Sequence, residues 1–256
     1  MQVVFFGASG AVPNRDSGNT CFLLRHDDGA GALLVDAAGD PVRHLKRAGT
    51  SVRDLDAIVL THTHTDHIYA LPSVFHVMRM LGRAKPLAVI GNEATLDFAR
   101  ALLDLFGHLD RDDMPQVEWQ TVEQGSRYET AGFTLDFFSA DHSRPCHGFA
   151  AESRGTTLVY SSDSAPNPIL SKAAWPGCTL IHEASGLHAD AGHLNALGHS
   201  SARQAGTVAA RVAAAHLFLC GLTADTQEEI DAARREAEDA SGLPVTFPEP
   251  GKVHTI

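Results

Sequence analysis

The sequence contains few cysteines, and none of them form a paired motif. The four cysteines are widely spaced in 256 residues, at Cys21, Cys146, Cys178 and Cys220. The absence of a Cys-x-x-Cys pair argues against a cysteine zinc site and against a disulfide framework. This cysteine usage fits a reducing compartment, and we expect a cytoplasmic protein.

Long hydrophobic runs and positive charge are also scarce. The chain has no apolar run of about 18 residues or more, and its N-terminal segment lacks the basic leader and long apolar core of a signal peptide. We therefore expect no membrane partner.

Net charge is −11, from 20 basic and 31 acidic residues. The densest basic stretches, 41–49 and 232–238, are typical of solvated helix faces, so we expect the chain to repel a polyanion such as RNA.

What the sequence does contain is a series of short apolar segments separated by turns. β-Branched and apolar runs predict strands, and apolar residues at three- and four-residue spacing predict helices. The predicted strands are 3–6, 21–25, 33–36, 57–60, 87–90, 133–138, 157–160, 179–182 and 217–220. The predicted helices are 41–48, 71–81, 94–106, 201–214 and 226–241. Hairpin turns at DDGAG and ESRGTT, with no linker between segments, indicate one layered α/β domain over residues 1–256.

One short segment concentrates three histidines and an aspartate. Residues 60–72 read LTHTHTDHIYALP and directly follow an apolar run. The chain has 15 histidines, yet this spacing arises by chance in roughly a few per thousand such chains. In extended backbone His62 and His64 point the same way and can bind one metal ion. Asp66 and His67 begin the next turn and can face a second metal a few ångströms away.

Two further polar residues follow predicted strands. His142 lies in FFSADHSRP, and Asp163 lies in LVYSSDS. Ligands gather at such strand ends in α/β folds. Each residue alone is a weak signal, because a lone aspartate there more often caps a turn or a helix. Together with the segment 60–72, they predict a metal centre.

These motifs occur in the order typical of one superfamily. Over most of its length the chain resembles the metallo-β-lactamase superfamily. FFGASGAVPNRDSGNTCFLL resembles its first two strands, LLVDAAGD its strand that ends in an aspartate beside the metal loop, and THTHTDH, His142 and Asp163 its remaining hallmark positions. LIHEAS followed by GHSSARQAG is most similar to the ribonuclease Z and small phosphodiesterase branch, in which the histidine of GHS, here His199, donates a proton.

The resemblance implies a four-layer αββα sandwich with zinc at the sheet edge, or manganese in its place. The implied ligands are His62, His64 and His142 for the first metal, Asp66 and His67 for the second, and Asp163 as a bridge. Imidazole and carboxylate ligands suit zinc, and a bridging water of lowered pKa becomes a hydroxide nucleophile near neutral pH. We expect Asp66 and His199 to be catalytic, and Asp36, Asp66 and Glu183 to orient ligands or the nucleophile.

Two features depart from the ribonuclease Z branch. That branch has a long tRNA-gripping arm between the positions matching His142 and Asp163, but here only residues 143–162 lie between them, enough for a hairpin. With the acidic charge, this makes tRNA an unexpected substrate. The branch also has a strand ending in Leu-Thr-His, whose histidine completes the second metal site, where LFLCGLTADTQ places Gly221. Cys220, Asp225, His193 and His188 are candidate substitutes, but the simplest interpretation is a weakened or empty second site.

The leading hypothesis is metal-dependent hydrolysis of a small ester, most of all a phosphodiester or cyclic phosphate. Lactone or thioester hydrolysis is an alternative in the same fold, and a binding or sensing module that keeps one metal without hydrolysis is another. A monomer and a homodimer are both open. The segment 188–201 is either a lid over the substrate or a solvated loop, and we expect the loop for His188 and His193. The sequence assigns no role to His182.

Overall fold

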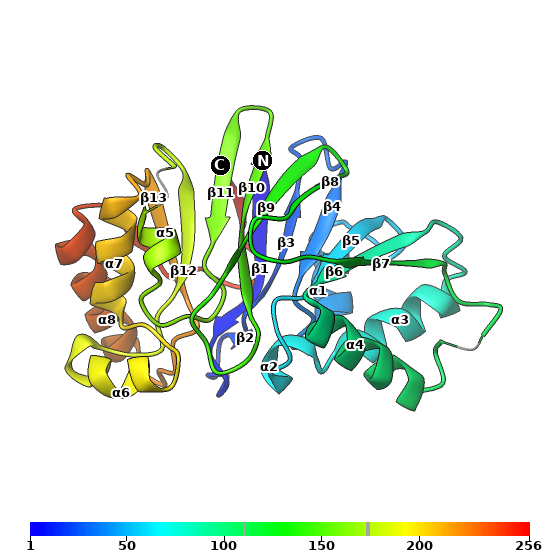
Figure 1. The fold of residues 1–256 in the computed structure, drawn as a ribbon, viewed down its shortest axis with the longest axis horizontal. Coiled ribbons are helices and arrows are strands. Elements are labelled where there is room, and N and C mark those ends of the chain that lie inside the picture. Colours follow the sequence, from blue (N-terminus) through cyan, green and yellow to red (C-terminus); the bar gives the residue numbers. More distant parts are fainter. Residues whose placement is uncertain (110, 173–174) are drawn as a thin grey trace.

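Two mixed β-sheets pack face to face in the computed structural model, which describes residues 1–109, 111–172 and 175–256 (Figure 1). The first sheet has the order β15-β1-β3-β4-β5-β6-β7, with β2 beside β1, and the second has the order β14-β13-β12-β11-β10-β9-β8. The strands of the first sheet are β1 (Gln2–Ser9), β2 (Gly18–Asn19), β3 (Cys21–Arg25), β4 (Ala32–Val35), β5 (Leu55–Val59), β6 (Leu87–Gly91), β7 (Val117–Thr121) and β15 (Val253–Thr255). Those of the second are β8 (Arg127–Thr130), β9 (Phe133–Ser139), β10 (His147–Ser153), β11 (Thr156–Tyr160), β12 (Thr179–Glu183), β13 (His216–Cys220) and β14 (Val245–Thr246).

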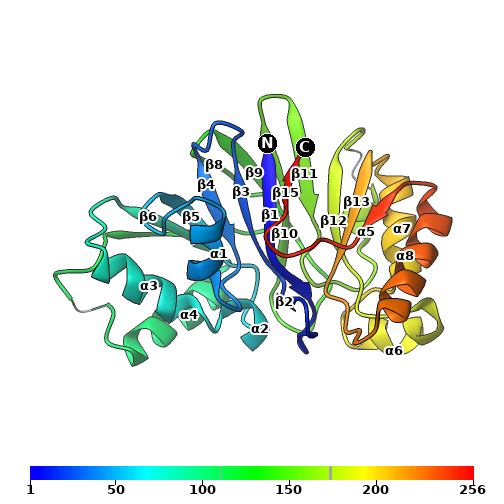
Figure 2. The same ribbon diagram turned by 180° about the vertical axis from the view of Figure 1, so that it is seen from behind.

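Helices cover the outer face of each sheet. On the first sheet lie α1 (Pro41–Arg47), α3 (Leu71–Met80) and α4 (Glu93–Leu105), and on the second lie α5 (Pro168–Lys172), α7 (Ala202–Arg211) and α8 (Gln227–Ser241) (Figures 1 and 2). The short helices α2 (Thr65–Ile68), η1 (His188–Asp190) and α6 (Ala191–Ala196) lie near one edge of the sandwich. Two sheets between two helical layers confirm the predicted four-layer αββα sandwich.

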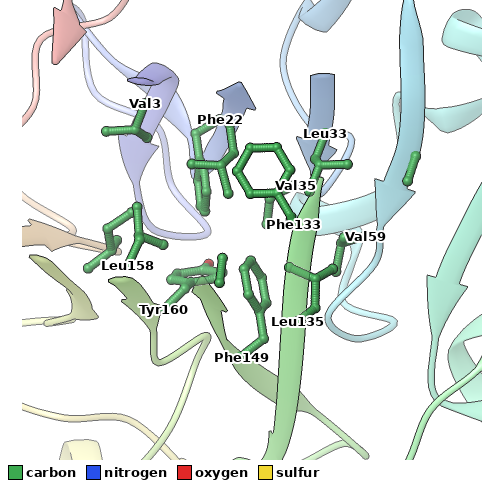
Figure 3. Close-up of a cluster of buried hydrophobic side chains, with 14 of the residues drawn as sticks. Val3, Phe22, Leu33, Val35, Val59, Phe133, Leu135, Phe149, Leu158 and Tyr160 are labelled. Carbon is green, nitrogen blue, oxygen red and sulfur yellow. The ribbon is translucent and has the colours of Figure 1, made fainter. Parts of the chain in front are cut away.

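A hydrophobic core fills the space between the two sheets. Phe22 and Leu33 from the first sheet meet Phe133, Phe149 and Tyr160 from the second (Figure 3). The rings of Phe22 and Tyr160 lie edge to face with centroids 5.0 Å apart. Such a pair adds about 0.5–1.5 kcal/mol beyond the burial of its apolar area. The sheets are thereby held together, and groups at their shared edge keep a fixed spacing.

Strand β1 shows how the sequence pattern separates the layers. Val3 and Phe5 belong to the core between the sheets, whereas Val4 and Phe6 belong to the core under the helices. Successive side chains of a strand point to opposite faces, so a strand covered on both faces is apolar throughout. This explains why the run at 3–6 shows no alternation of polar and apolar residues.

All predicted elements are confirmed, but several observed elements were not predicted, among them the short β2, β14, β15, α2 and α5. Every predicted strand and helix has a counterpart within a few residues of its predicted ends. The turns at 27–31 and 152–157 connect β3 to β4 and β10 to β11, both antiparallel pairs, as expected. The sequence did not predict β7, β8 or β10. It was also wrong about a loop at 188–201, where η1 and α6 occur. No helix in the described part of the chain has the length and apolarity needed to cross a bilayer.

Candidate metal centre and active site

The candidate ligands follow three strands from both sheets. His62, His64, Asp66 and His67 come after β5 of the first sheet, whereas His142 follows β9 and Asp163 follows β11 of the second. Three overlapping groups have ligand atoms that all lie within 4.8 Å of one another: His62, His64 and His142; His62, His67 and Asp163; and His142, Asp163 and His199. Five of the six residues predicted as ligands therefore belong to such a group, and Asp66 lies beside them.

The first of these groups has the geometry of a metal-binding triad. The Nδ1 atom of His64 lies 3.1 Å from Nε2 of His62 and 2.9 Å from Nε2 of His142. Zinc–nitrogen bonds of about 2.0–2.1 Å in a tetrahedron separate neighbouring nitrogens by about 3.3 Å. The three imidazoles thus fit around one ion. Burial lowers the pKa of His62 well below its ordinary value, which keeps the ring neutral and able to bind a metal.

Hydrogen bonds on the far side of the rings fix which nitrogen faces the centre. His142 donates from Nδ1 to the Gly198 carbonyl at 2.8 Å. Thr61 donates its hydroxyl proton to Asp36, so this hydroxyl accepts the Nδ1 proton of His62 at 3.0 Å. In both histidines Nε2 is therefore unprotonated, and its lone pair faces the other candidate metal-ligand atoms. Second-layer bonds of this kind orient the ligands of metal sites, so the donor set fits a divalent metal.

Asp36 is the buried anchor beneath this cluster. It accepts hydrogen bonds from the Thr61 amide at 2.9 Å and from Nδ1 of His67 at 2.7 Å. Its φ of 57° is left-handed, an uncommon conformation for a residue other than glycine. Burial raises the pKa of the Asp36 carboxyl, while His67 and Thr61 oppose that shift. Asp36 therefore holds the His67 ring so that Nε2 faces the other candidate metal-ligand atoms. The sequence predicted such an orienting role for Asp36.

A second group of donors surrounds His67. Its Nε2 atom lies 3.5 Å from Oδ2 of Asp163 and 3.6 Å from Oδ2 of Asp66, and the same Asp163 oxygen lies 3.9 Å from Nε2 of His62. Although burial lowers the pKa of His67, the Asp163 and Asp36 carboxylates raise it well above its ordinary value. Asp163 lies between the two groups, which is the position a bridging ligand requires.

His199 and Glu183 form a pair at the edge of the ligand cluster. The Nδ1 atom of His199 lies 3.1 Å from Oε1 of Glu183, and the buried carboxylate also accepts bonds from the Ser164 and Ser200 amides at 3.0 Å each. Burial raises the pKa of Glu183 to about 7. Burial also lowers the pKa of His199, but the hydrogen bond and charge of Glu183 outweigh it, so the pKa lies above its ordinary value. The imidazole of His199 therefore keeps its second proton to a higher pH than an ordinary histidine does.

These groups open into a cavity of about 780 Å³. Asp66, His67, Asp163 and His199 form its polar floor, and its apolar walls include Tyr69 and, at α6, Leu194 and Leu197. The region 188–201 therefore contributes a wall of the cavity, whereas His188 and His193 themselves are exposed, as predicted.

The sequence matches the profile of the beta-lactamase superfamily domain over residues 32–221. The chain belongs to this superfamily. Ribonuclease Z of Mycobacterium bovis (strain BCG / Pasteur 1173P2) is 28% identical over 196 residues, which cover 71% of this chain and 69% of the relative. These matches confirm the predicted superfamily and its ribonuclease Z-like branch, so the protein is a hydrolase of the metallo-β-lactamase fold, which implies the use of a divalent metal.

Solved structures show the same fold along the whole chain. The metallo-beta-lactamase fold protein YhfI from Bacillus subtilis has a TM-score of 0.82 and 22% identity, with 99% of this chain and 98% of that chain covered. The short form of human tRNase Z has a TM-score of 0.78 and 21% identity, with 100% of this chain and 99% of that chain covered.

Gly221 is the residue that the sequence predicted in place of a histidine ligand of the second metal site. It lines the same cavity as Asp66 and His67, and its φ is +76°. Among the residues that the structure describes, none of the four candidate substitutes, Cys220, Asp225, His188 and His193, belongs to a group with metal-ligand spacing. The second group of donors thus consists of His62, His67 and Asp163, with Asp66 beside them.

Some supporting residues were missed by sequence reasoning. Thr61 bridges Asp36 and His62, and the Gly198 carbonyl orients His142. A threonine directly before the first histidine is a visible signal for the first contact. The second contact comes from a backbone carbonyl, which any residue carries, so residue identity gives no signal for it.

Proposed function

We propose that this hydrolase cleaves a small phosphodiester or cyclic phosphate at the cluster of His62, His64, His142 and Asp163. The observation that carries the proposal is the convergence of imidazole and carboxylate donors within 4.8 Å, beside a histidine held by a buried glutamate. We further propose zinc as the ion, because three imidazoles and a carboxylate are ligands that zinc prefers.

A bound divalent metal supplies a Lewis acid for the phosphoryl oxygen and lowers the pKa of water in its coordination sphere. The chain's own residues then move and hold protons. Nδ1–H of His199 donates a hydrogen bond to Glu183 and keeps its proton, while Nε2–H of the protonated ring delivers its proton to the leaving oxygen and the ring becomes neutral. Asp66, whose carboxylate lines the cavity, is our candidate for orienting the attacking water and accepting its proton.

A phosphodiester is the favoured bond because the relative from Mycobacterium bovis is named a ribonuclease. A small substrate is favoured over tRNA because the net charge is −11 and residues 143–162 form little more than the β10–β11 hairpin. Affinity for an RNA backbone depends on cationic contacts. Precursor tRNA should therefore bind weakly and remain uncut at physiological salt, and specific 3′ cleavage at low enzyme concentration would contradict this.

A substrate panel tests the proposed reaction. Bis-p-nitrophenyl phosphate, 2′,3′-cyclic nucleotides, lactones and thioesters are each incubated with the zinc- and the manganese-loaded protein. We expect turnover of the phosphate esters and loss of most of it in His199→Ala, since general acid catalysis contributes about 10²- to 10⁴-fold. If only lactones or thioesters are hydrolysed, the proposed phosphodiester substrate is wrong. If no compound of the panel is hydrolysed, a binding or sensing role is favoured.

Metal content tests the ligand assignment independently of activity. Elemental analysis should find about one tightly bound zinc or manganese per chain, much less in His64→Ala, and an unchanged amount in His199→Ala. A metal-free wild-type protein, or equal content in His64→Ala, would show that the ligands are wrongly assigned.

A further inference from the structure

A second cavity, of about 550 Å³, adjoins the metal site on the side of α1. Arg15, Arg43, His44 and Arg47 line it, and Asn19 lines both this cavity and the one that holds the metal ligands. The two cavities therefore lie next to each other at Asn19. We call it the arginine cavity.

Three arginines and two aspartates line the arginine cavity, so its charged side chains sum to a positive charge. Arg43 and Arg47 are four residues apart in α1 and so lie on the same side of the helix, and Arg15 comes from the segment between β1 and β2. Arg43 pairs with Asp40 at 3.1 Å. Within the described residues, Arg15 and Arg47 have no carboxylate at ion-pair distance, although Asp16 lies nearby in the lining. Three guanidinium groups at one cavity stand out in a chain of net charge −11.

His44 adds a hydrogen-bonding group to the arginine cavity. Its ring stacks on Phe6 with centroids 5.4 Å apart, which fixes its orientation. The Nδ1 atom of this ring is buried and has no hydrogen-bond partner among the described residues. Burial lowers the pKa of His44, and the charges of Arg43 and Arg47 lower it further. The ring is thus a neutral group among cations.

The wall between the two cavities is held by side-chain hydrogen bonds. Asn19 donates from Nδ2 to the Gly10 carbonyl at 2.7 Å, and the Tyr69 hydroxyl accepts the Gly39 amide proton at 2.8 Å. Tyr69 in turn reaches Oδ1 of Asn19 at 3.5 Å. The segment after β1, the segment before α1 and the end of the metal-binding segment are thereby connected, so the arginine cavity keeps its place beside the metal centre.

We propose that the arginine cavity binds a second phosphate group of the substrate whose scissile phosphodiester lies at the metal centre. This inference rests on the proposed function and narrows it to nucleotide-sized phosphodiesters that carry a further phosphate. Guanidinium groups bind phosphate through paired, charge-assisted hydrogen bonds, and Arg15 and Arg47 have such donors available. Arginines gathered at 41–49 serve substrate binding in addition to forming a solvated helix face.

Paired substrates test the arginine cavity by kinetics. The metal-loaded protein is given the p-nitrophenyl ester of thymidine 5′-phosphate, with or without a 3′-phosphate. We expect the 3′-phosphate to raise kcat/KM at least 10-fold, mainly through KM, and this ratio to approach one in the double variant Arg15→Gln/Arg47→Gln. Arg211→Gln, which removes an exposed arginine of α7, is the matched control and should keep the ratio. Equal kcat/KM for both esters in the wild type, or an equal loss in the control, would overturn the proposal.

Calorimetry separates failure of this inference from failure of the proposed function. Thymidine 3′,5′-bisphosphate should bind the metal-loaded protein at least 10-fold more tightly than thymidine 5′-monophosphate, and the double variant should lose this preference. If neither ester is hydrolysed but the preference and its loss are observed, the arginine cavity stands and the proposed reaction falls. If an ester is hydrolysed and the two nucleotides bind equally, the reaction stands and the arginine cavity is not a phosphate site.

Discussion

Asp36 orients His67 through a hydrogen bond of 2.7 Å, and the variant Asp36→Asn tests its importance. The asparagine amide lacks the negative charge that stabilises the His67 tautomer protonated at Nδ1. The ring therefore loses its fixed orientation. Loss of such a partner typically lowers metal affinity 10- to 100-fold. Competition with a chromogenic chelator should show this for zinc. Asp136→Asn, which disrupts an exposed ion pair with Arg127, is the control and should keep the wild-type affinity. Equal zinc affinity in the two variants would contradict the role of Asp36.

Gly221 limits how the second metal site can be restored. A Cβ at this position would lie 3.3 Å from Cβ of Glu183, and the φ of +76° is strained for any other residue by about 1–2 kcal/mol. We expect Gly221→His and Gly221→Ala to lower the apoprotein's unfolding free energy by similar amounts. Only the histidine variant should raise zinc occupancy towards two per chain. Zinc titration by calorimetry is the measurement, and two equally tight sites in the wild type would show that another residue already fills the gap.

The buried His182 makes stability depend on pH. Its Nδ1 donates to the Glu183 carbonyl at 2.7 Å, and burial lowers its pKa to about 4. As pH falls from about 6.5 towards 4, the unfolded chain takes up a proton at His182 before the folded protein does, so stability is lost in this window. The loss at pH 5 is about 2 kcal/mol relative to pH 7.5.

The variant His182→Asn isolates this contribution, because the amide keeps a donor and does not titrate. Urea unfolding with chelator at pH 7.5 and pH 5 should show a smaller decrease in unfolding free energy for the variant than for the wild type. Identical decreases would mean that His182 is not the responsible group.

Single residues differ in how far the sequence reveals them. The segment 62–67 combines ligand types at a spacing that metal binding requires, and His142 and Asp163 follow apolar strands, so all six were predicted together. Their assignment as ligands stays a prediction that metal analysis tests. Thr61 was missed although it directly precedes His62, whereas the Gly198 carbonyl could not be predicted as a partner, because it meets His142 only after the chain has folded.

At the scale of elements, α6 and the residue that follows it form an apolar wall of the metal-site cavity. We expect this wall to contribute little to the stability of the fold. Leu197 is 50% exposed, so Leu197→Ser should leave the melting temperature nearly unchanged. The same change should raise KM for bis-p-nitrophenyl phosphate about 3- to 10-fold, since the aryl group loses apolar contact. Leu105→Ser, at an 80% exposed position in α4, is the control and should not alter KM. An equal KM in all three proteins would exclude this wall from substrate binding.

The elements that were predicted are those with a strong apolar pattern. Strands covered on both faces are apolar throughout, and the helices that pack on them show an apolar stripe. Strands β7 (VEWQT) and β8 (RYET) are half polar because they lie at the ends of their sheets, and so they give a weak signal. The short helix α6 was missed because Gly192 and Asn195 are poor helix formers and its contacts are tertiary.

At the scale of the whole molecule, the metal centre joins the two sheets. Its proposed ligands follow β5 in the first sheet and β9 and β11 in the second, so a bound ion should stabilise the packing of one sheet on the other. Free zinc at about 100 times its dissociation constant stabilises the folded state by about 2.7 kcal/mol.

Scanning calorimetry with zinc and with chelator measures this effect. We expect a lower melting temperature with chelator and a single transition in both conditions, because one core is shared by both sheets and residues 1–256 are predicted to form one domain. His64→Ala should show a much smaller difference between the two conditions. Two separate transitions would contradict the single domain.

The pairing of β1 with β15 has a consequence for synthesis on the ribosome. Gln2 pairs with Thr255 and Val4 with Val253, so one edge of β1 is completed by a strand that is very distant along the chain (Figure 2). Until residues 253–255 have left the exit tunnel, that edge of β1 has unpaired amide and carbonyl groups, which can pair with another chain. The nascent chain therefore carries this open strand edge while all the elements from β2 to β14 are synthesised, and chaperone binding should be most important in this period.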